Sequence, residues 1–183
     1  MRWPIYQASQ ILHHNGVIAY PTETVWGLGC NPQQTEGLQR LLALKKRDAQ
    51  KGLILIAAHI EQFDFLLKQL PPKKIDLLKA SWPGPVTWLV PHHGLVHPLV
   101  HGRFATVAIR VSTSKLVQDL CREFGGPIVS TSANEAGQVT VQNAIQAHKF
   151  LGPQLDFILS GPLGDTQSPS RIIDLQSGRI IRG

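Results

Sequence analysis

The sequence has few cysteines, few charged residues and no long apolar run. Its two cysteines, Cys30 and Cys121, lie far apart and neither belongs to a C-x-x-C pair, which argues against a disulfide framework and a paired-thiol redox site. No window reaches the uninterrupted apolar length of a membrane span, and the first residues carry no apolar run typical of a signal peptide. We therefore expect a cytoplasmic protein with two reduced thiols and no membrane segment.

Two common nucleotide-binding motifs are also absent. The chain has no G-x-x-x-x-G-K-[ST] sequence, which excludes a P-loop. The segment GLGC at 27–30 contains two glycines but is followed by Asn31 and Pro32, so no helix begins where the pyrophosphate of a dinucleotide would need one. Any phosphate site must therefore be built from side chains and loops.

The net charge is positive. The 183 residues carry a formal net charge of +6 and a sequence pI near 9.6. Such a charge favours polyanionic partners such as nucleotides or RNA, but it also serves simply to keep a small protein soluble. With 43% hydrophobic residues the chain can bury one substantial core, and we expect a single domain over residues 1–183.

Short β-rich apolar runs alternate with segments of helical period, which predicts an α/β domain. The predicted strands cover residues 17–20, 53–58, 86–90, 106–111, 128–130, 157–159, 172–175 and 179–182. The predicted helices cover residues 5–15, 35–46, 114–124 and 141–150. The pair Pro71 and Pro72 and the turn-rich segment 161–169 predict surface loops.

Four histidines lie close together in one segment: His92, His93, His97 and His101. The last three are spaced by four residues, which on a helix would place them on one face as zinc ligands. Proline and glycine at positions 91, 94, 98 and 102 interrupt the segment, and no cysteine or carboxylate joins the cluster. We therefore expect a partly protonatable loop and no metal site.

Polar side chains directly follow two of the predicted strands. Thr22 comes after the first strand, where open α/β sheets usually build sites, although a threonine there also serves as a turn cap. The stretch GGPIVSTSANEAGQ, residues 125–138, passes from an apolar run into Ser130, Thr131, Ser132 and Asn134. A turn uses one or two such side chains, so four of them in five positions indicate something more than a turn.

Basic residues stand at two further places. Lys45, Lys46, Arg47 and Lys51 lie between a helix end and a strand, where cations also suit a solvated turn because of the helix macrodipole. Arg110 interrupts the apolar strand TVAIRVS. A buried guanidinium needs a partner, and its forked N–H groups match a carboxylate or a phosphate.

Taken together, these pieces resemble the YrdC family of threonylcarbamoyl-AMP synthases. The motifs AYPTETVWGLGCNP, LKKRDAQKGLILIAA, SWPGPVTWLVP, TVAIRVS and PIVSTSANEAGQ occur in the order and spacing of that family and span nearly the whole chain. The length is similar to the short form of the family, which lacks an additional C-terminal domain. The resemblance implies a twisted mixed sheet with flanking helices around a large positive cleft.

The resemblance also implies a reaction. L-Threonine, bicarbonate and ATP give L-threonylcarbamoyl-adenylate and pyrophosphate, and a downstream threonylcarbamoyl-transferase complex uses the product to modify adenosine in tRNA. Mg²⁺ is expected on the triphosphate rather than in a protein cage. A second hypothesis stays open, in which a non-catalytic RNA-binding or ribosome-maturation factor uses the same basic cleft.

Positions that match the family motifs imply a division of the cleft between two substrates. The implied threonine-binding residues are Thr22, Arg110, Ser130 and Ser170. The implied ATP-binding residues are Lys45, Arg47, Thr106, Ser132, Asn134, Thr140 and Arg182. Of these, Lys45, Arg47 and Ser132 are also implied as catalytic, because the leaving pyrophosphate accumulates negative charge. The segment PSRIIDL departs from the commoner PSTVVDL at Arg171, and no motif residue is required as a general base, although Glu23 adjoins Thr22.

Overall fold

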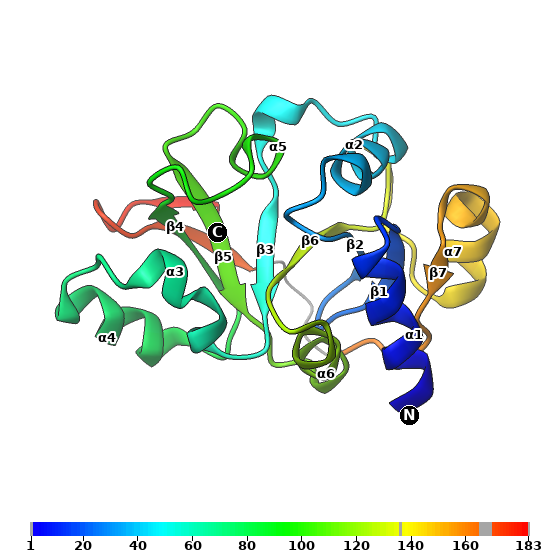
Figure 1. The fold of residues 1–183 in the computed structure, drawn as a ribbon, viewed down its shortest axis with the longest axis horizontal. Coiled ribbons are helices and arrows are strands. Elements are labelled where there is room, and N and C mark those ends of the chain that lie inside the picture. Colours follow the sequence, from blue (N-terminus) through cyan, green and yellow to red (C-terminus); the bar gives the residue numbers. More distant parts are fainter. Residues whose placement is uncertain (1, 136, 165–169, 183) are drawn as a thin grey trace.

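The computed structural model describes residues 2–135, 137–164 and 170–182, which form a nine-stranded sheet flanked by helices (Figure 1). The strands are β1 (Ile18–Pro21), β2 (Trp26–Gly29), β3 (Ile54–Ala57), β4 (Val86–Pro91), β5 (Thr106–Val111), β6 (Ile128–Ser132), β7 (Phe157–Ile158), β8 (Arg171–Asp174) and β9 (Ile180–Arg182). The α-helices are α1 (Arg2–His13), α2 (Thr35–Leu44), α3 (Asp64–Leu67), α4 (Pro72–Ser81), α5 (Pro98–His101), α6 (Lys115–Phe124) and α7 (Ala144–Leu151). The short 3-10 helices are η1 (Ala49–Lys51), η2 (Ile60–Phe63) and η3 (Gly152–Gln154).

The sheet is mixed in direction. Its strand order is β7-β1-β2-β6-β3-β5-β4-β8-β9. Strand β3 runs parallel to β5 and antiparallel to β6, and β4 runs antiparallel to β5 and parallel to β8. The order differs strongly from the chain order, so segments distant in sequence meet at the centre of the sheet. The predicted mixed α/β architecture is confirmed.

The two faces of the sheet belong to two apolar clusters. In β3, Leu55 and Ala57 point into the larger cluster and Ile56 into the smaller one, as the two-residue period of a strand requires. The smaller cluster packs the sheet against α1 and α6, and the larger cluster contains apolar residues of α2, α3 and α4. In Figure 1, α3 and α4 lie near one end of the molecule and α7 near the other.

Sequence patterns located most of these elements, and local capping explains several of the boundaries. The Ser114 hydroxyl accepts a hydrogen bond from the Val117 amide and begins α6, and Gly125 ends it with φ of 83°. Helix α7 begins at Ala144 rather than at 141, because the Asn143 side chain accepts a hydrogen bond from the Gln146 amide. The predicted loop at 161–169 lies partly outside the described residues, and its described part contains no helix or strand.

Strand β2 and helix α4 are among the elements that the sequence prediction lacks. Strand β2 contains two glycines, which weaken strand propensity, yet a Cβ on Gly29 would lie 2.8 Å from both a Tyr20 ring carbon and the Val129 carbonyl oxygen. Glycine therefore marks a close approach of neighbouring chain segments there. Helix α4 begins at Pro72, so the predicted loop at Pro71 and Pro72 is wrong beyond its first residue, since proline suits the first turn of a helix as well as a loop. Within the described residues, no helix is long and apolar enough to cross a membrane.

Candidate active site

A cavity of about 510 Å³ opens over the central strands of the sheet. Its walls come from β3, β5 and β6, from the turn that follows α2, from the α5 segment and from the β8–β9 hairpin. The predicted site residues that line it are Thr22, Arg47, Thr106, Arg110, Ser130, Ser132, Thr140, Ser170 and Arg182. The fold thus brings motifs from the whole length of the chain to one cavity.

Positive charge dominates the lining of this cavity. Among the described residues, the formally charged side chains that line it are Arg47, Lys51, Arg110 and Arg182. Burial, and then the nearby charge of Arg110, lower the pKa of Arg182. Cations gathered in a concave and partly desolvated site attract anionic ligands. This cavity corresponds to the positive cleft that the resemblance implied.

Lys45 and Asn134 differ from the other predicted site residues because they do not line the cavity. The Lys45 ammonium donates hydrogen bonds to the Ser132 carbonyl oxygen at 2.5 Å, the Asn134 carbonyl oxygen at 2.8 Å and Asn134 Oδ1 at 3.3 Å. The Ser132 hydroxyl also donates to Asn134 Oδ1, at 2.6 Å. Both residues therefore join the cavity through Ser132, which does line it.

The surroundings of Lys45 change its acidity. The residue is only 3% exposed. Burial, and to a lesser extent the charge of Arg47, lower the pKa of Lys45 to about 8. An ammonium in this environment is poorly solvated, so a phosphate oxygen can compete with the neutral oxygens that it now holds.

Arg47 lines the cavity with part of its hydrogen-bonding capacity unused. Its Nη2 donates to the Gly52 carbonyl oxygen at 2.9 Å. Its Nε is buried and has no partner among the described residues. Burial lowers the pKa of Arg47 against the opposing charge of Asp48. A buried cationic donor without a partner is costly, and an anionic ligand would remove that cost.

The Gly52 carbonyl that holds Arg47 is braced by the α5 segment. The Leu53 amide donates to the Val100 carbonyl oxygen at 2.8 Å, and the Arg103 amide donates to the Gln50 carbonyl oxygen at 3.2 Å. Gly102 permits this contact, since a Cβ at that position would lie 2.4 Å from the Gln50 oxygen.

Replacing Gly102 by alanine is expected to lower the free energy of unfolding by more than about 1 kcal/mol, because the residue has φ of 62° and no room for a Cβ. Gly94→Ala is the matched control, since Gly94 has φ of 77° and a Cβ added there would meet nothing within 4 Å. Urea denaturation of both variants measures the difference. Equal denaturation midpoints would contradict the bracing role.

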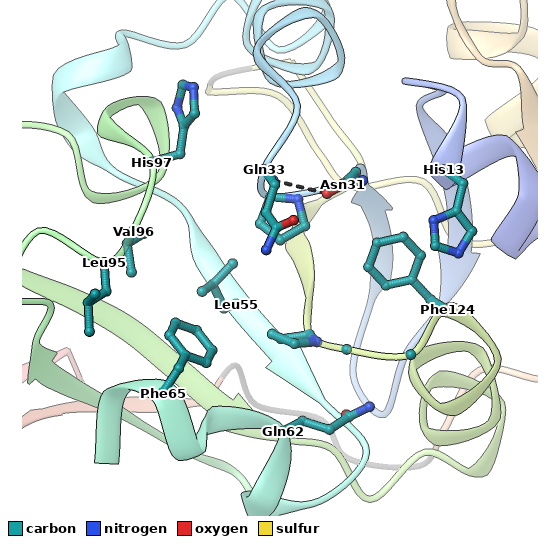
Figure 2. A pocket seen from close by; sticks show the side chains of 14 residues that line it. His13, Asn31, Gln33, Leu55, Gln62, Phe65, Leu95, Val96, His97 and Phe124 are labelled. Atoms are coloured by element: carbon teal, nitrogen blue, oxygen red, sulfur yellow. Dashed lines mark hydrogen bonds between the residues drawn. The ribbon is translucent and has the colours of Figure 1, made fainter. Parts of the chain in front are cut away.

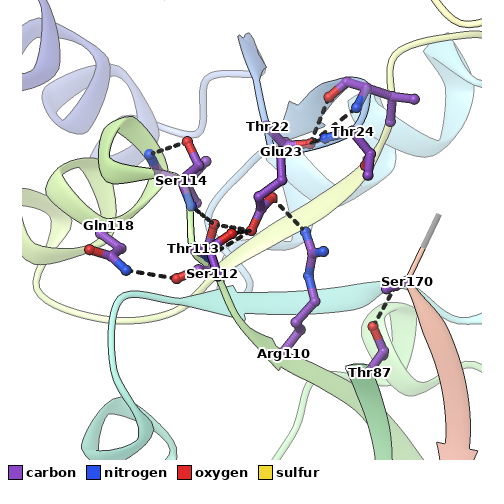
Figure 3. Close-up of polar contacts among 12 residues, drawn as sticks. Thr22, Glu23, Thr24, Thr87, Arg110, Ser112, Thr113, Ser114, Gln118 and Ser170 are labelled. Carbon is purple, nitrogen blue, oxygen red and sulfur yellow. Dashed lines mark hydrogen bonds and ion pairs between the residues drawn. The ribbon is translucent and has the colours of Figure 1, made fainter. Parts of the chain in front are cut away.

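Arg110 finds its charged partner in Glu23, which follows β1 (Figure 3). The Arg110 Nη2 lies 3.1 Å from Glu23 Oε2, and the two side chains are 9% and 8% exposed. Burial alone would raise the pKa of Glu23, but the Arg110 charge and the hydrogen bonds from Ser112 and Thr113 outweigh it and lower that pKa. The Glu23 side chain is thus held in its charged carboxylate form.

Ser170, directly before β8, is a further polar residue of the wall. Ser170 is buried, and its hydroxyl lies 2.8 Å from the Thr87 hydroxyl. The Arg182 Nη2 donates to the Ser170 carbonyl oxygen at 2.9 Å. Arg171, the departure from the common motif, is exposed and is not among the residues that line the cavity. Its side chain alternates away from the cavity while Ser170 and Ile172 line it.

The histidine segment contains more regular structure than the predicted loop. Pro98 begins the single-turn helix α5, and His97 caps it by accepting a hydrogen bond from the Leu99 amide. His92 and His101 stack with ring centroids 4.0 Å apart, and His101 lines the cavity. In the described parts of the chain, no three His, Cys, Asp or Glu side chains are grouped so that they could hold a metal ion.

Figure 2 shows residues that line a second cavity, of about 360 Å³. Leu55 lines it together with Phe65 and Phe124, whereas the neighbours of Leu55 along β3, Ile54 and Ile56, line the first cavity. Polar groups on its wall are largely engaged: the Gln62 side chain bonds the Ala58 amide and the Cys121 carbonyl oxygen. None of the predicted threonine- or ATP-binding residues lines it.

Several residues of the first cavity were not predicted from the sequence. Phe104 and His101 line the cavity, as Lys51 does. They reach it because the α5 segment packs against η1, and this contact cannot be read from the sequence. Glu23, which does not line the cavity but pairs with Arg110, was noted only as a neighbour of Thr22. The buried Arg110 did signal that a carboxylate or phosphate partner exists, but nothing in the sequence identified which one.

Comparison with known proteins gives close relatives over almost the full chain. The model of the Sua5/YciO/YrdC family, described as Telomere recombination, matches residues 10–183. A protein of Stutzerimonas stutzeri (strain A1501), named Threonylcarbamoyl-AMP synthase, is 48% identical over 180 residues, which are 98% of this chain and 97% of the relative. A protein of the same name from Saccharophagus degradans is 49% identical over 176 residues, covering 96% and 92% of the two chains.

Solved structures agree with this assignment. P. abyssi Sua5 complexed with L-threonine has a TM-score of 0.90 at 29% identity, covering 98% of this chain and 53% of that chain. This chain thus spans about half the length of the solved Sua5 chain. Full-length HypF in its phosphate- and nucleotide-bound form, at 18% identity and a TM-score of 0.83, shares the fold over 98% of this chain and 28% of its own. The resemblance drawn from the motifs is confirmed, and this chain belongs to the Sua5/YciO/YrdC family.

Proposed function

We propose that this protein is an L-threonylcarbamoyl-adenylate synthase, which joins L-threonine, bicarbonate and ATP and releases pyrophosphate. The observation that carries the proposal is the single cavity that Arg47, Arg110 and Arg182 share. It has cations for a carboxylate and for phosphates within one space. Relatives named Threonylcarbamoyl-AMP synthase, 48% identical over nearly the whole length of both chains, support the same activity.

Threonine would bind in this cavity beside Arg110, which lines it. Arg110 presents a guanidinium whose forked geometry suits the amino-acid carboxylate. The Thr22 hydroxyl donates to the Val25 carbonyl oxygen at 2.7 Å and accepts from the Thr24 and Val25 amides at 3.4 Å each. An N–H of the substrate amine would replace one of these two long bonds. Ser130 and Ser170 line the same cavity and would orient the substrate further.

ATP would place its phosphates against the turn that follows α2. Arg47 lines the cavity, and its buried Nε, which has no partner among the described residues, would meet a phosphate oxygen once the guanidinium turns toward the nucleotide. Lys45 would exchange the Ser132 and Asn134 oxygens for phosphate oxygens, while the Ser132 hydroxyl adds a neutral hydrogen bond. Thr106, Thr140 and Arg182 line the remainder of the site that we assign to the nucleotide.

The reaction would proceed in two bond-forming steps. The neutral amine of threonine attacks the carbon of bicarbonate or carbon dioxide and forms a carbamate, with water lost in the bicarbonate case and a proton released to solvent in the carbon dioxide case. A carbamate oxygen then attacks the α-phosphorus in line, and pyrophosphate leaves. Holding the reactants together can supply about 7–11 kcal/mol of barrier reduction, and the basic side chains stabilise the leaving charge. No carboxylate is among the described residues that line the cavity, so Mg²⁺ would be held by the triphosphate oxygens.

The remaining parts of the proposal concern the cell rather than the cavity. Its product would supply the N6-threonylcarbamoyl modification of tRNA through a downstream threonylcarbamoyl-transferase complex. Direct contact with tRNA, action of residues 1–183 as one domain and a cytoplasmic location belong to the same proposal.

The test is threonine-dependent release of pyrophosphate. The protein is incubated with ATP, bicarbonate and Mg²⁺, with threonine, with serine or with no amino acid, and the adenylate is identified by mass spectrometry. Release that depends on threonine and on bicarbonate is expected. RNA binding without such release would instead favour the non-catalytic RNA-binding factor.

The acidity of Lys45 leads to a pH-dependent affinity for nucleotide. The pKa of Lys45 is about 8 in the unliganded protein, and only the ammonium form attracts phosphate. Affinity for a non-hydrolysable ATP analogue should therefore be complete below that pKa and fall as the pH rises from about 7.5 to about 9.5. Fluorescence titration without threonine measures it. Lys45→Arg should remove most of the decline, since arginine stays charged, and an equal decline in that variant would contradict the assignment.

A further inference from the structure

Arg110 must be held in one orientation if it is to bind a carboxylate productively. It lies on the central strand β5, opposite Ile56 of β3. Among the described residues, the hydrogen bond that its guanidinium donates goes from Nη2 to Glu23 Oε2, at 3.1 Å. The other N–H groups of this fork are left for the cavity that Arg110 lines.

Glu23 is itself anchored on its second oxygen. Its Oε1 accepts hydrogen bonds from the Ser112 hydroxyl at 2.6 Å and from the Thr113 amide at 2.8 Å, with the Thr113 hydroxyl at 3.4 Å. The Ser112 hydroxyl in turn accepts from the Ser114 amide at 3.1 Å. Figure 3 shows the carboxylate between this group and the Arg110 guanidinium. The anchor lies at the junction of β5 and α6.

This arrangement is unsuited to a general base. Both Glu23 oxygens already accept hydrogen bonds from the protein, and the carboxylate is paired with a buried cation. Its pKa is lowered, whereas a general base that works near neutral pH needs a pKa close to that pH. The proton of the threonine amine must therefore leave by another route.

We propose that Glu23 is the positioning residue of the amino-acid site. It accepts one N–H of Arg110 and so holds the guanidinium with its other N–H groups facing the threonine carboxylate. This inference rests on the proposed function, because it assigns Arg110 to threonine. Glu23 acts through Arg110 and does not touch the substrate. Its effect therefore falls on the use of threonine and not on the use of ATP.

The variant Glu23→Gln tests the inference, since it keeps the size of the side chain and removes its charge. One of its two terminal atoms becomes an N–H donor and cannot accept from both sides. We expect KM for threonine to rise by at least about tenfold, KM for ATP to change by less than about twofold, and kcat at saturating threonine to be largely kept. Ser112→Ala, which removes one donor from Oε1 and leaves the ion pair, should shift KM for threonine in the same direction by less.

Each outcome of this experiment separates the alternatives. An unchanged KM for threonine in folded Glu23→Gln overturns the proposal, and so do equal rises in both KM values, which indicate general damage. Loss of kcat at saturating threonine, together with loss of the acidic limb of the pH profile, overturns it in favour of a general base. If Glu23→Gln does not fold, Ser112→Ala decides by the same KM comparison. Absence of threonine-dependent pyrophosphate release in the unaltered protein refutes the proposed function instead.

Discussion

Lys45→Ala is expected to reduce kcat for pyrophosphate release by about 10²–10³-fold, equivalent to about 2.7–4 kcal/mol, the usual effect of losing one donor at a developing anion. The leaving pyrophosphate gains negative charge as the carbamate attacks. In the proposed site Lys45 would meet that charge from a position where only 3% of the residue is exposed, so water would screen the interaction weakly. Steady-state kinetics at saturating ATP and threonine measure the loss.

The fold of this variant must be checked separately, because Lys45 also holds the segment after β6. Without the ammonium, the Ser132 and Asn134 carbonyl oxygens lose a charged donor, which costs about 1–3 kcal/mol of stability if they stay buried. Lys45→Met is the control for side-chain volume, and Lys46→Ala is the control for charge, since Lys46 is exposed and paired with Glu135. Full activity in folded Lys45→Ala would refute the placement of the phosphates.

Arg110→Met is expected to lower the free energy of unfolding by about 3–5 kcal/mol, because it leaves the Glu23 carboxylate buried without its countercharge. Threonine should no longer saturate the enzyme, since the proposed carboxylate partner is gone. Urea denaturation measures the first effect, and the dependence of pyrophosphate release on threonine concentration measures the second.

The double variant Glu23→Gln, Arg110→Met separates stability from binding. Removing both charges avoids the uncompensated carboxylate, so much of the lost stability should return. Threonine saturation should not return, because no guanidinium remains. A double variant as unstable as Arg110→Met would show that the ion pair is not the cause of the loss. Normal threonine use in folded Arg110→Met would place the amino acid elsewhere.

Local patterns in the sequence were reliable where the cause of structure is local. The strands β3 and β5 follow from apolar runs, and α6 follows from its periodicity, its Ser114 cap and its terminal Gly125. The same reasoning failed at β2, where Gly29 leaves room for the Tyr20 ring, and at α4, where Pro72 is an N-terminal helix residue. Glycine occurs both in turns and in strands that pack closely against a neighbour, and proline occurs both in loops and in the first turn of a helix. The residue type alone therefore does not distinguish the two structures.

The sequence by itself determined the chemical groups available: a row of hydroxyls after one strand, basic residues after a helix, and an arginine inside an apolar strand. These follow from residue type and from the short periods of helix and strand. Only the tertiary structure decided which groups meet. Lys45 reaches the Ser132 carbonyl and Arg110 reaches Glu23 across 87 residues each. Such pairs depend on the strand order β2-β6-β3-β5, which no local pattern specifies because long-range pairing is fixed by packing of the whole sheet.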